Sequence, residues 1–140
     1  MARTKKKFLV DTQVFVWIFT EPKRFSNTAR AFLKATENND FYLSHVSSWE
    51  ISIKYGIGKL QLPQPPEEFI PERLFLSEYV HLPIALDHIF AVRSLPTIHR
   101  DPFDRLLVSQ AKVERMTLLT SDRELSKYDI KTLQFSDLSK

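Results

Sequence analysis

The chain has 140 residues, a length that fits one compact domain with its own hydrophobic core. Hydrophobic residues make up 43% and charged residues 26%, a globular balance that excludes an intrinsically disordered chain. The formal net charge of +3 suits a polyanionic partner without selecting one, and the absence of cysteine excludes disulfides and thiolate metal sites.

The first seven residues are strongly basic, with Arg3, Lys5, Lys6 and Lys7 close together. We expect residues 1–7 to form a solvated, flexible tail, and the alternative is an arm that contacts phosphates. The apolar run that follows is interrupted by Asp11 and lacks a cleavage site, so we do not expect a secretory signal. No segment reaches the ~18 apolar residues of a membrane span. We therefore expect a soluble cytoplasmic protein, with residues 1–140 forming a single domain.

The first half of the chain alternates short apolar runs with helical patterns. Residues 8–10 predict a buried strand that ends at Asp11, and residues 14–19 an apolar turn or short helix. Ser26 is a good N-cap for a helix over residues 27–36. A turn at 38–40 and a second strand at 41–43 follow. The next helix carries an apolar stripe and ends at the two glycines; the stripe consists of Val46, Trp49, Ile53 and Ile57.

The second half continues the alternation. Prolines at 63–66 predict a connector, a helix over 67–78 is kinked at Pro71, and residues 80–82 form a third strand. A helix over 86–95 and a loop at 96–100 precede the clearest helix, which Asp101 and Pro102 open. Strands are expected at 116–119 and 131–135. Short apolar strands alternating with helices predict an α/β fold, with a parallel sheet covered on both faces.

Four acidic residues fall where such a sheet brings distant positions together. Asp11 and Asp122 follow strands, Glu50 lies in the helix after the second strand, and Asp104 lies in the first turn of its helix. The carboxyl ends of parallel strands share one edge, where ligands bind. Clustered carboxylates repel one another unless a cation binds, and hard oxygen ligands suit Mg²⁺ or Mn²⁺. Such ions activate water for phosphodiester hydrolysis, so the pattern predicts a nuclease.

Most of these acids also have a structural interpretation. Ser47 with Glu50, and Asp101 with Asp104, fit the spacing of a helix capping box. Asp122 could cap a turn. Asp11 has few such reasons, because it interrupts an apolar run. When the four acids are taken together, the metal interpretation is stronger than the separate structural ones.

Other residue types receive a simpler interpretation. We expect Trp17 and Trp49 to pack in the core. The histidines show no metal-ligand spacing and are expected to be ordinary; they are His45, His81, His88 and His99. Thr120 could hydrogen-bond a metal ligand or serve only as a strand residue. Arg100 and Arg105 could contact phosphate, or pair with the acids beside them.

These residues give the chain a resemblance to the PIN-domain ribonucleases, specifically the VapC-type toxins of bacterial toxin–antitoxin pairs. The resemblance runs in the family's order over nearly the whole chain, and the run His-Arg-Asp-Pro-Phe-Asp-Arg is its most specific part. The matching stretches are residues 8–17, 44–54, 58–60, 95–96, 99–111 and 118–122.

The resemblance implies a three-layer α/β/α sandwich with a central, mostly parallel sheet, and an endoribonuclease that uses Mg²⁺ or Mn²⁺. It implies an RNA substrate, a homodimer and a cognate antitoxin protein. The implied metal and catalytic residues are Asp11, Glu50, Asp104 and Asp122, supported by Asp101, Thr120 and Thr12. The residues expected to contact RNA are Arg100, Arg105, Gln13 and Lys54. Many relatives carry histidine where this chain has Gln13, which cannot titrate, so we expect altered substrate contacts there.

Three alternatives stay open at this level. A structure-specific DNA nuclease would use the same metal chemistry, and nothing in these residues reads a 2′-hydroxyl. A non-catalytic module could keep the fold to bind RNA or a partner. A phosphoryl-accepting regulatory domain is disfavoured because it needs a lysine near its aspartates on a late strand or loop. The sequence identifies neither the RNA, its cleavage site nor the antitoxin, and it does not decide between one metal ion and two.

Overall fold

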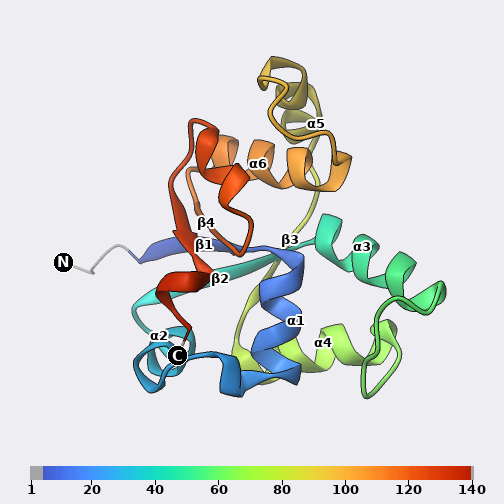
Figure 1. The fold of residues 1–140 in the computed structure, drawn as a ribbon, viewed down its shortest axis with the longest axis vertical. Coiled ribbons are helices and arrows are strands. Elements are labelled where there is room, and N and C mark those ends of the chain that lie inside the picture. Colours follow the sequence, from blue (N-terminus) through green and yellow to red (C-terminus); the bar gives the residue numbers. More distant parts are fainter. Residues whose placement is uncertain (1–4, 140) are drawn as a thin grey trace.

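The computed structural model describes residues 5–139, which form a five-stranded parallel sheet covered by helices (Figure 1). The strand order is β3-β2-β1-β4-β5, and every pairing is parallel. The strands are β1 (Lys6–Val10), β2 (Asn39–Ser44), β3 (Val80–Leu82), β4 (Thr117–Thr120) and β5 (Thr132–Gln134). The helices are α1 (Thr12–Thr20), α2 (Asn27–Lys34), α3 (His45–Gly56), α4 (Pro66–Ser77), α5 (Leu86–Ala91) and α6 (Pro102–Glu114), with 3₁₀ turns η1 (Pro22–Arg24), η2 (Val92–Ser94), η3 (Arg123–Lys127) and η4 (Phe135–Asp137).

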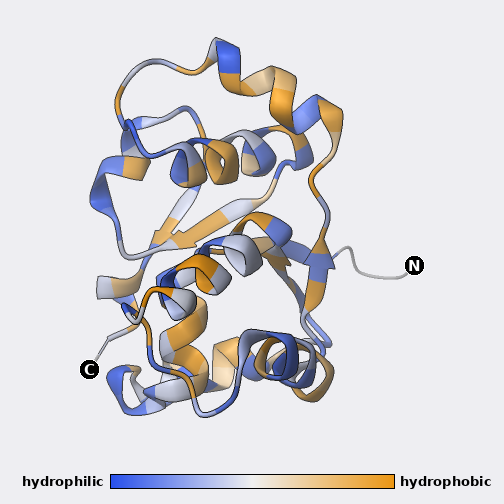
Figure 2. Cartoon of the chain, turned by 90° about the vertical axis from the view of Figure 1, so that its right-hand side faces the viewer, coloured by the Kyte–Doolittle hydropathy of each residue, from blue (hydrophilic) through white to orange (hydrophobic). Residues whose placement is uncertain are grey.

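Side chains of the strands alternate between two apolar layers, as the two-residue period of a strand requires. Phe8 and Val10 of β1 pack into the cluster that contains α1, α2 and α4, whereas Leu9 packs into the cluster that contains α6. In Figure 1, α1, α2 and α4 lie on one side of the sheet and α5 and α6 on the other. Figure 2 shows mostly hydrophobic strands between helices that carry both kinds of residue. The three-layer α/β/α prediction is therefore confirmed.

The elements agree with the sequence prediction in kind and differ at their ends. Ser26 caps α2 as expected, accepting from the backbone N–H of Ala29 at 3.1 Å. The expected helix over 86–95 is divided into α5 and η2, and the turn expected at 38–40 lies earlier, because β2 begins at Asn39. Lys6 and Lys7 belong to β1, so any basic tail ends before them, and the predicted role of Arg3 falls outside the described residues.

The prediction for the apolar stripe of α3 is wrong in part. Val46 is fully buried, but Trp49, Ile53 and Ile57 are 55%, 41% and 62% exposed. The stripe turns outward because α3 touches the rest of the fold mainly through its other face, which includes Ile51. Trp17 agrees better with expectation, since it packs against the main core cluster.

None of the described helices has the length and hydrophobicity that a membrane span requires.

Candidate active site

The four predicted acids lie at the carboxyl edge of the sheet, on four different elements. Asp11 directly follows β1 and is the N-cap of α1, and Asp122 follows β4 and is the N-cap of η3. Glu50 lies in the second turn of α3, and α3 follows β2 directly, without a loop. Asp104 lies in the first turn of α6. Because β1 is flanked by β2 and β4, the elements that carry Asp11, Glu50 and Asp122 start from neighbouring strands, whereas α6 follows a loop after η2.

Asp11 is only 7% exposed and is held by three hydrogen bonds. Its Oδ1 accepts from the backbone N–H of Val14 at 2.8 Å, and its Oδ2 accepts from the Thr120 hydroxyl at 2.5 Å and the Ser121 N–H at 3.2 Å. Burial raises the pKa of Asp11 above its usual 3.8, the three donors lower it, and the charge of Glu50 raises it further. The carboxylate is thus fixed in place in a setting where its charge is unfavourable.

Thr120 connects the two aspartates that follow strands. Its side chain is fully buried at the end of β4. While its hydroxyl donates to Asp11, the same oxygen accepts from the backbone N–H of Asp122 at 3.0 Å. The expected supporting position of Thr120 beside an acid is therefore observed. Thr12 is also buried, and its hydroxyl donates to Ser47 at 2.9 Å, which ties α1 to α3 rather than touching an acid.

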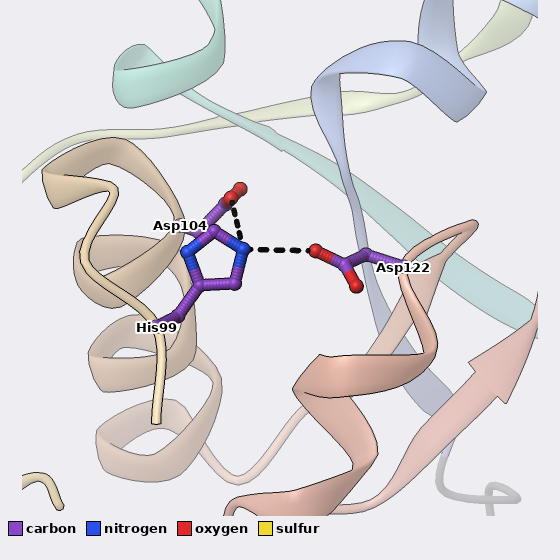
Figure 3. A group of neighbouring side chains, drawn as sticks. All are labelled: His99, Asp104 and Asp122. Carbon is purple, nitrogen blue, oxygen red and sulfur yellow. Dashed lines mark hydrogen bonds and ion pairs between the residues drawn. The ribbon is translucent and has the colours of Figure 1, made fainter. Parts of the chain in front are cut away.

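His99 lies between Asp104 and Asp122 (Figure 3). Its Nε2 is 3.0 Å from Asp122 Oδ2 and 3.4 Å from Asp104 Oδ2. These three side chains offer ligand atoms within 4.8 Å of one another, and they form the only such metal-compatible group among residues 5–139. Asp11 and Glu50 do not belong to this tight group, although their charges act on it.

Asp104 shows how strongly the acids interact. Burial, the largest cause, and the negative charges of Asp101, Glu50 and Asp11 together raise its pKa to about 7, against the opposing effect of His99. Among the described residues, no lysine or arginine pairs with Asp11, Asp104 or Asp122. These three aspartates therefore lack a direct ion pair with a lysine or an arginine.

Glu50 is the exception, because it has its own counter-ion. Lys54, one helical turn later, places its Nζ 2.8 Å from Glu50 Oε2. That hydrogen bond is the main reason why the pKa of Lys54 is raised, and the charges of Asp101 and Asp104 add to it against the opposing effect of burial. The ammonium expected to contact RNA therefore lies against the acidic cluster itself.

The acids differ in whether they cap a helix. α3 is capped by Ser44, three residues earlier than expected, so Glu50 is too far along the helix for a capping box. Asp101 does cap α6, accepting from the N–H of Phe103 at 2.8 Å. Its own N–H donates to His99 Nδ1, so Asp104 does not complete a capping box. Asp122 caps η3 through one oxygen and faces His99 with the other.

The two arginines have different surroundings. Arg105 donates from its guanidinium to four backbone carbonyls of the preceding loop, those of Val92, Leu95, Pro96 and His99, at 3.0–3.4 Å. It therefore fastens the segment that carries His99. Arg100 and Gln13 are exposed, and neither arginine forms an ion pair with an acid among the described residues.

The donor set fits a hard divalent cation. Carboxylate oxygens dominate, no thiolate is available in the chain, and the buried, mutually repelling acids have an electrostatic need for positive charge. Of the two ions predicted, Mg²⁺ and Mn²⁺, both accept such ligands.

Sequence reasoning missed His99 as part of the site. Its closeness in sequence to Asp101 and Asp104 is a local signal that could have identified it, but its contact with Asp122 depends on the fold. Tyr128 was also missed: its buried hydroxyl accepts from the backbone N–H of His99 at 2.9 Å. No motif rule connects these positions, which lie 29 residues apart.

The chain is similar in sequence to proteins of a known family. The family model described as "PIN domain" matches residues 8–131. Ribonuclease VapC16 of Mycobacterium tuberculosis is 36% identical over 62 residues, a match that covers 44% of this chain and 42% of that protein. The aligned part is thus less than half the length of that relative.

Solved structures share the fold at low sequence identity. VapBC2 from Rickettsia felis, solved with a promoter DNA fragment, aligns with a TM-score of 0.70 and 18% identity, covering 91% of this chain and 98% of that one. DNA-bound VapBC from Salmonella typhimurium aligns with a TM-score of 0.68 and 16% identity, covering 93% of this chain and 98% of that one. FitAcB from Neisseria gonorrhoeae aligns with a TM-score of 0.65 and 21% identity, covering 94% of this chain and 99% of that one. At these identities the likeness supports the fold alone.

Proposed function

The chain belongs to the PIN domain family, and from this premise we propose that it is a divalent-metal-dependent endoribonuclease, the toxin of a toxin–antitoxin pair. The observation that carries the proposal is the convergence of Asp11, Glu50, Asp104 and Asp122 at one edge of the sheet, with no lysine or arginine pairing three of them among the described residues. Similarity to a curated ribonuclease supports RNA as the substrate.

Asp11, Asp104 and Asp122 would hold the cation, Mg²⁺ or Mn²⁺, with Glu50 completing the set or orienting water. When bound, the ion would lower the pKa of an attacking water and offset phosphate charge. The protein's own part is to fix the acids before substrate arrives. Thr120 and two backbone N–H groups orient Asp11, and Asp101 starts the helix that presents Asp104.

Asp104 couples ion binding to protonation. Because its pKa lies at about 7 without a cation, a large fraction of Asp104 is protonated near neutral pH. Binding a divalent ion requires the ionised form and therefore releases this proton. We expect metal affinity to fall as the pH drops below 7.

Substrate contacts would come from groups at the rim of this edge. Arg100 and Gln13 are exposed, and both are close to the acids along the chain, so they remain candidates for contacting phosphate and base. Arg105 and Lys54 are better explained as groups that bind the protein's own atoms, because their cationic ends already contact loop carbonyls and Glu50. A soluble, cytoplasmic homodimer inhibited by a cognate antitoxin protein completes the proposal, in line with the VapBC complexes of similar fold.

The test is cleavage by the purified protein of an RNA and of a DNA of the same sequence, with Mg²⁺, Mn²⁺ or EDTA. We expect metal-dependent cleavage of the RNA, and its loss in Asp11→Asn. Asp40→Asn is the matched control, because Asp40 lies in β2 and pairs with Lys5 instead of the cluster. Cleavage of the DNA alone would favour the DNA-nuclease alternative, and full activity of Asp11→Asn would refute the assignment.

A further inference from the structure

The imidazole of His99 reaches into the acidic cluster from the loop before α6, on a side chain that is 25% exposed. Two roles are open to it: a nitrogen ligand for the cation, or a hydrogen-bond donor to the acids. We propose that His99 is a positioning residue whose Nε2–H orients Asp122 and Asp104, and that it does not ligate the metal. This inference rests on the proposed function of the same site.

The hydrogen bonds of the ring determine which nitrogen carries the proton. The backbone N–H of Asp101 donates to His99 Nδ1 at 3.2 Å, so Nδ1 must present its lone pair. In a neutral imidazole the other nitrogen is then protonated. The Nε2–H consequently points at acceptors, and both groups nearest to it are carboxylate oxygens.

The two carboxylates are not equivalent partners. Asp122 Oδ2 lies 3.0 Å from Nε2, within hydrogen-bonding distance, whereas Asp104 Oδ2 lies at 3.4 Å. The bond to Asp122 joins the segment after β4 to the segment before α6, which no backbone hydrogen bond of the sheet connects. The second oxygen of Asp122 is used by the Glu124 N–H, so both of its oxygens have a fixed direction.

Hydrogen bonds to the backbone of His99 also fix the position of this residue. Its N–H donates to the buried hydroxyl of Tyr128 at 2.9 Å, and its carbonyl accepts from Arg105 at 3.3 Å. If Nε2 offered a lone pair to a metal, the proton of the neutral ring would sit on Nδ1, and two donors, Nδ1–H and the Asp101 N–H, would face each other. A metal-ligand role would therefore break the contact that anchors the ring at the start of α6.

Partners that orient a metal's carboxylate ligands typically contribute 10–100-fold to affinity. A donor role makes a distinctive demand on substitutions: an amide N–H should replace the imidazole N–H, and an apolar side chain should not. A ligand role predicts instead that both kinds of side chain weaken binding, because a glutamine amide is a poor substitute for an imidazole nitrogen.

The experiment compares wild type, His99→Gln and His99→Leu, with His81→Gln as control because His81 lies on the edge strand β3 and contacts His45 instead of an acid. Mn²⁺ affinity is measured by the loss of the free-ion electron paramagnetic resonance signal. We expect His99→Leu to weaken binding roughly 10–100-fold, and His99→Gln and the control to stay within a few-fold of wild type. Unfolding curves verify that each variant is folded.

A second readout does not depend on any variant. In ¹⁵N-histidine-labelled wild type, heteronuclear NMR identifies the protonated ring nitrogen, and we expect Nε2–H both without metal and with Mg²⁺. Loss of the Nε2 proton on adding Mg²⁺, unchanged affinity in His99→Leu, or equal losses in His99→Gln and His99→Leu would each overturn the positioning role. These outcomes leave the proposed function intact, whereas failure of wild type to bind Mn²⁺ would refute both.

Discussion

Removing the charge of Asp104 should stabilise the metal-free protein, and the structure gives the size of the effect. Burial and neighbouring acids raise the pKa of Asp104 from 3.8 to about 7. At 1.36 kcal/mol for each pKa unit, the ionised carboxylate costs about 4 kcal/mol of folding free energy. The side chain is 24% exposed and loses its attraction to His99 when neutralised, so we expect Asp104→Asn to recover about 2 kcal/mol.

The pH dependence has a definite sign. Because the pKa of Asp104 is higher in the folded state, the two states differ between pH 4 and pH 7: there the folded protein still holds the proton that the unfolded chain has already released. The stability of wild type contributed by this group is therefore present below pH 4 and is lost as the pH rises to about 7. Asp104→Asn lacks this titration, so its advantage should be small at pH 4 and complete at pH 8.

The assay is urea unfolding in EDTA at pH 4, 6 and 8, followed by tryptophan fluorescence. Asp40→Asn is the control, because its ion pair with Lys5 lies away from the cluster. We expect the control to show no such gain, and saturating Mg²⁺ to stabilise wild type more than Asp104→Asn. A variant no more stable than wild type at pH 8, or a gain that does not change with pH, would refute the reasoning about clustered charge.

Four further substitutions test other parts of the site. Thr120→Val removes the hydroxyl that bridges two aspartates and should cost about 2–4 kcal/mol of stability, measured by urea unfolding, as well as most of the cleavage activity. Arg105→Met should lower the free energy of unfolding by about 2 kcal/mol and speed amide hydrogen exchange over residues 92–99. Arg100→Met should leave the exchange unchanged and lower the salt dependence of RNA binding. Lys54→Met should tighten Mg²⁺ binding a few-fold in calorimetry, because a positive charge beside the cluster is removed; weaker binding would show that it helps to assemble the site.

Much of the fold is readable from the sequence because the signals are local. The apolar run at β1, the serine that caps α2, and the Asp-Pro start of α6 each specify their own element. Parallel strands then bring Asp11 and Asp122 to one edge by topology alone. The prediction of a parallel sheet covered on both faces followed from these signals and needed no information on contacts.

The remaining features depend on tertiary packing. Trp49 belongs to an apolar helical stripe, yet it is 55% exposed, because periodicity does not reveal which side of a helix the rest of the chain covers. His99 enters the site through contact with Asp122, 23 residues away. The carbonyls that hold Arg105 are equally invisible in the sequence, since any residue type could supply them.

The most direct test is a crystal structure of the protein grown with Mn²⁺, with anomalous diffraction used to locate the ion. The account places anomalous density in coordination with carboxylate oxygens of Asp11, Asp104 and Asp122, about 2.2 Å from them, and absent from the same position in Asp11→Asn. Density bound only to acids elsewhere on the surface, or unchanged in Asp11→Asn, would contradict the claim that this sheet edge is a metal centre.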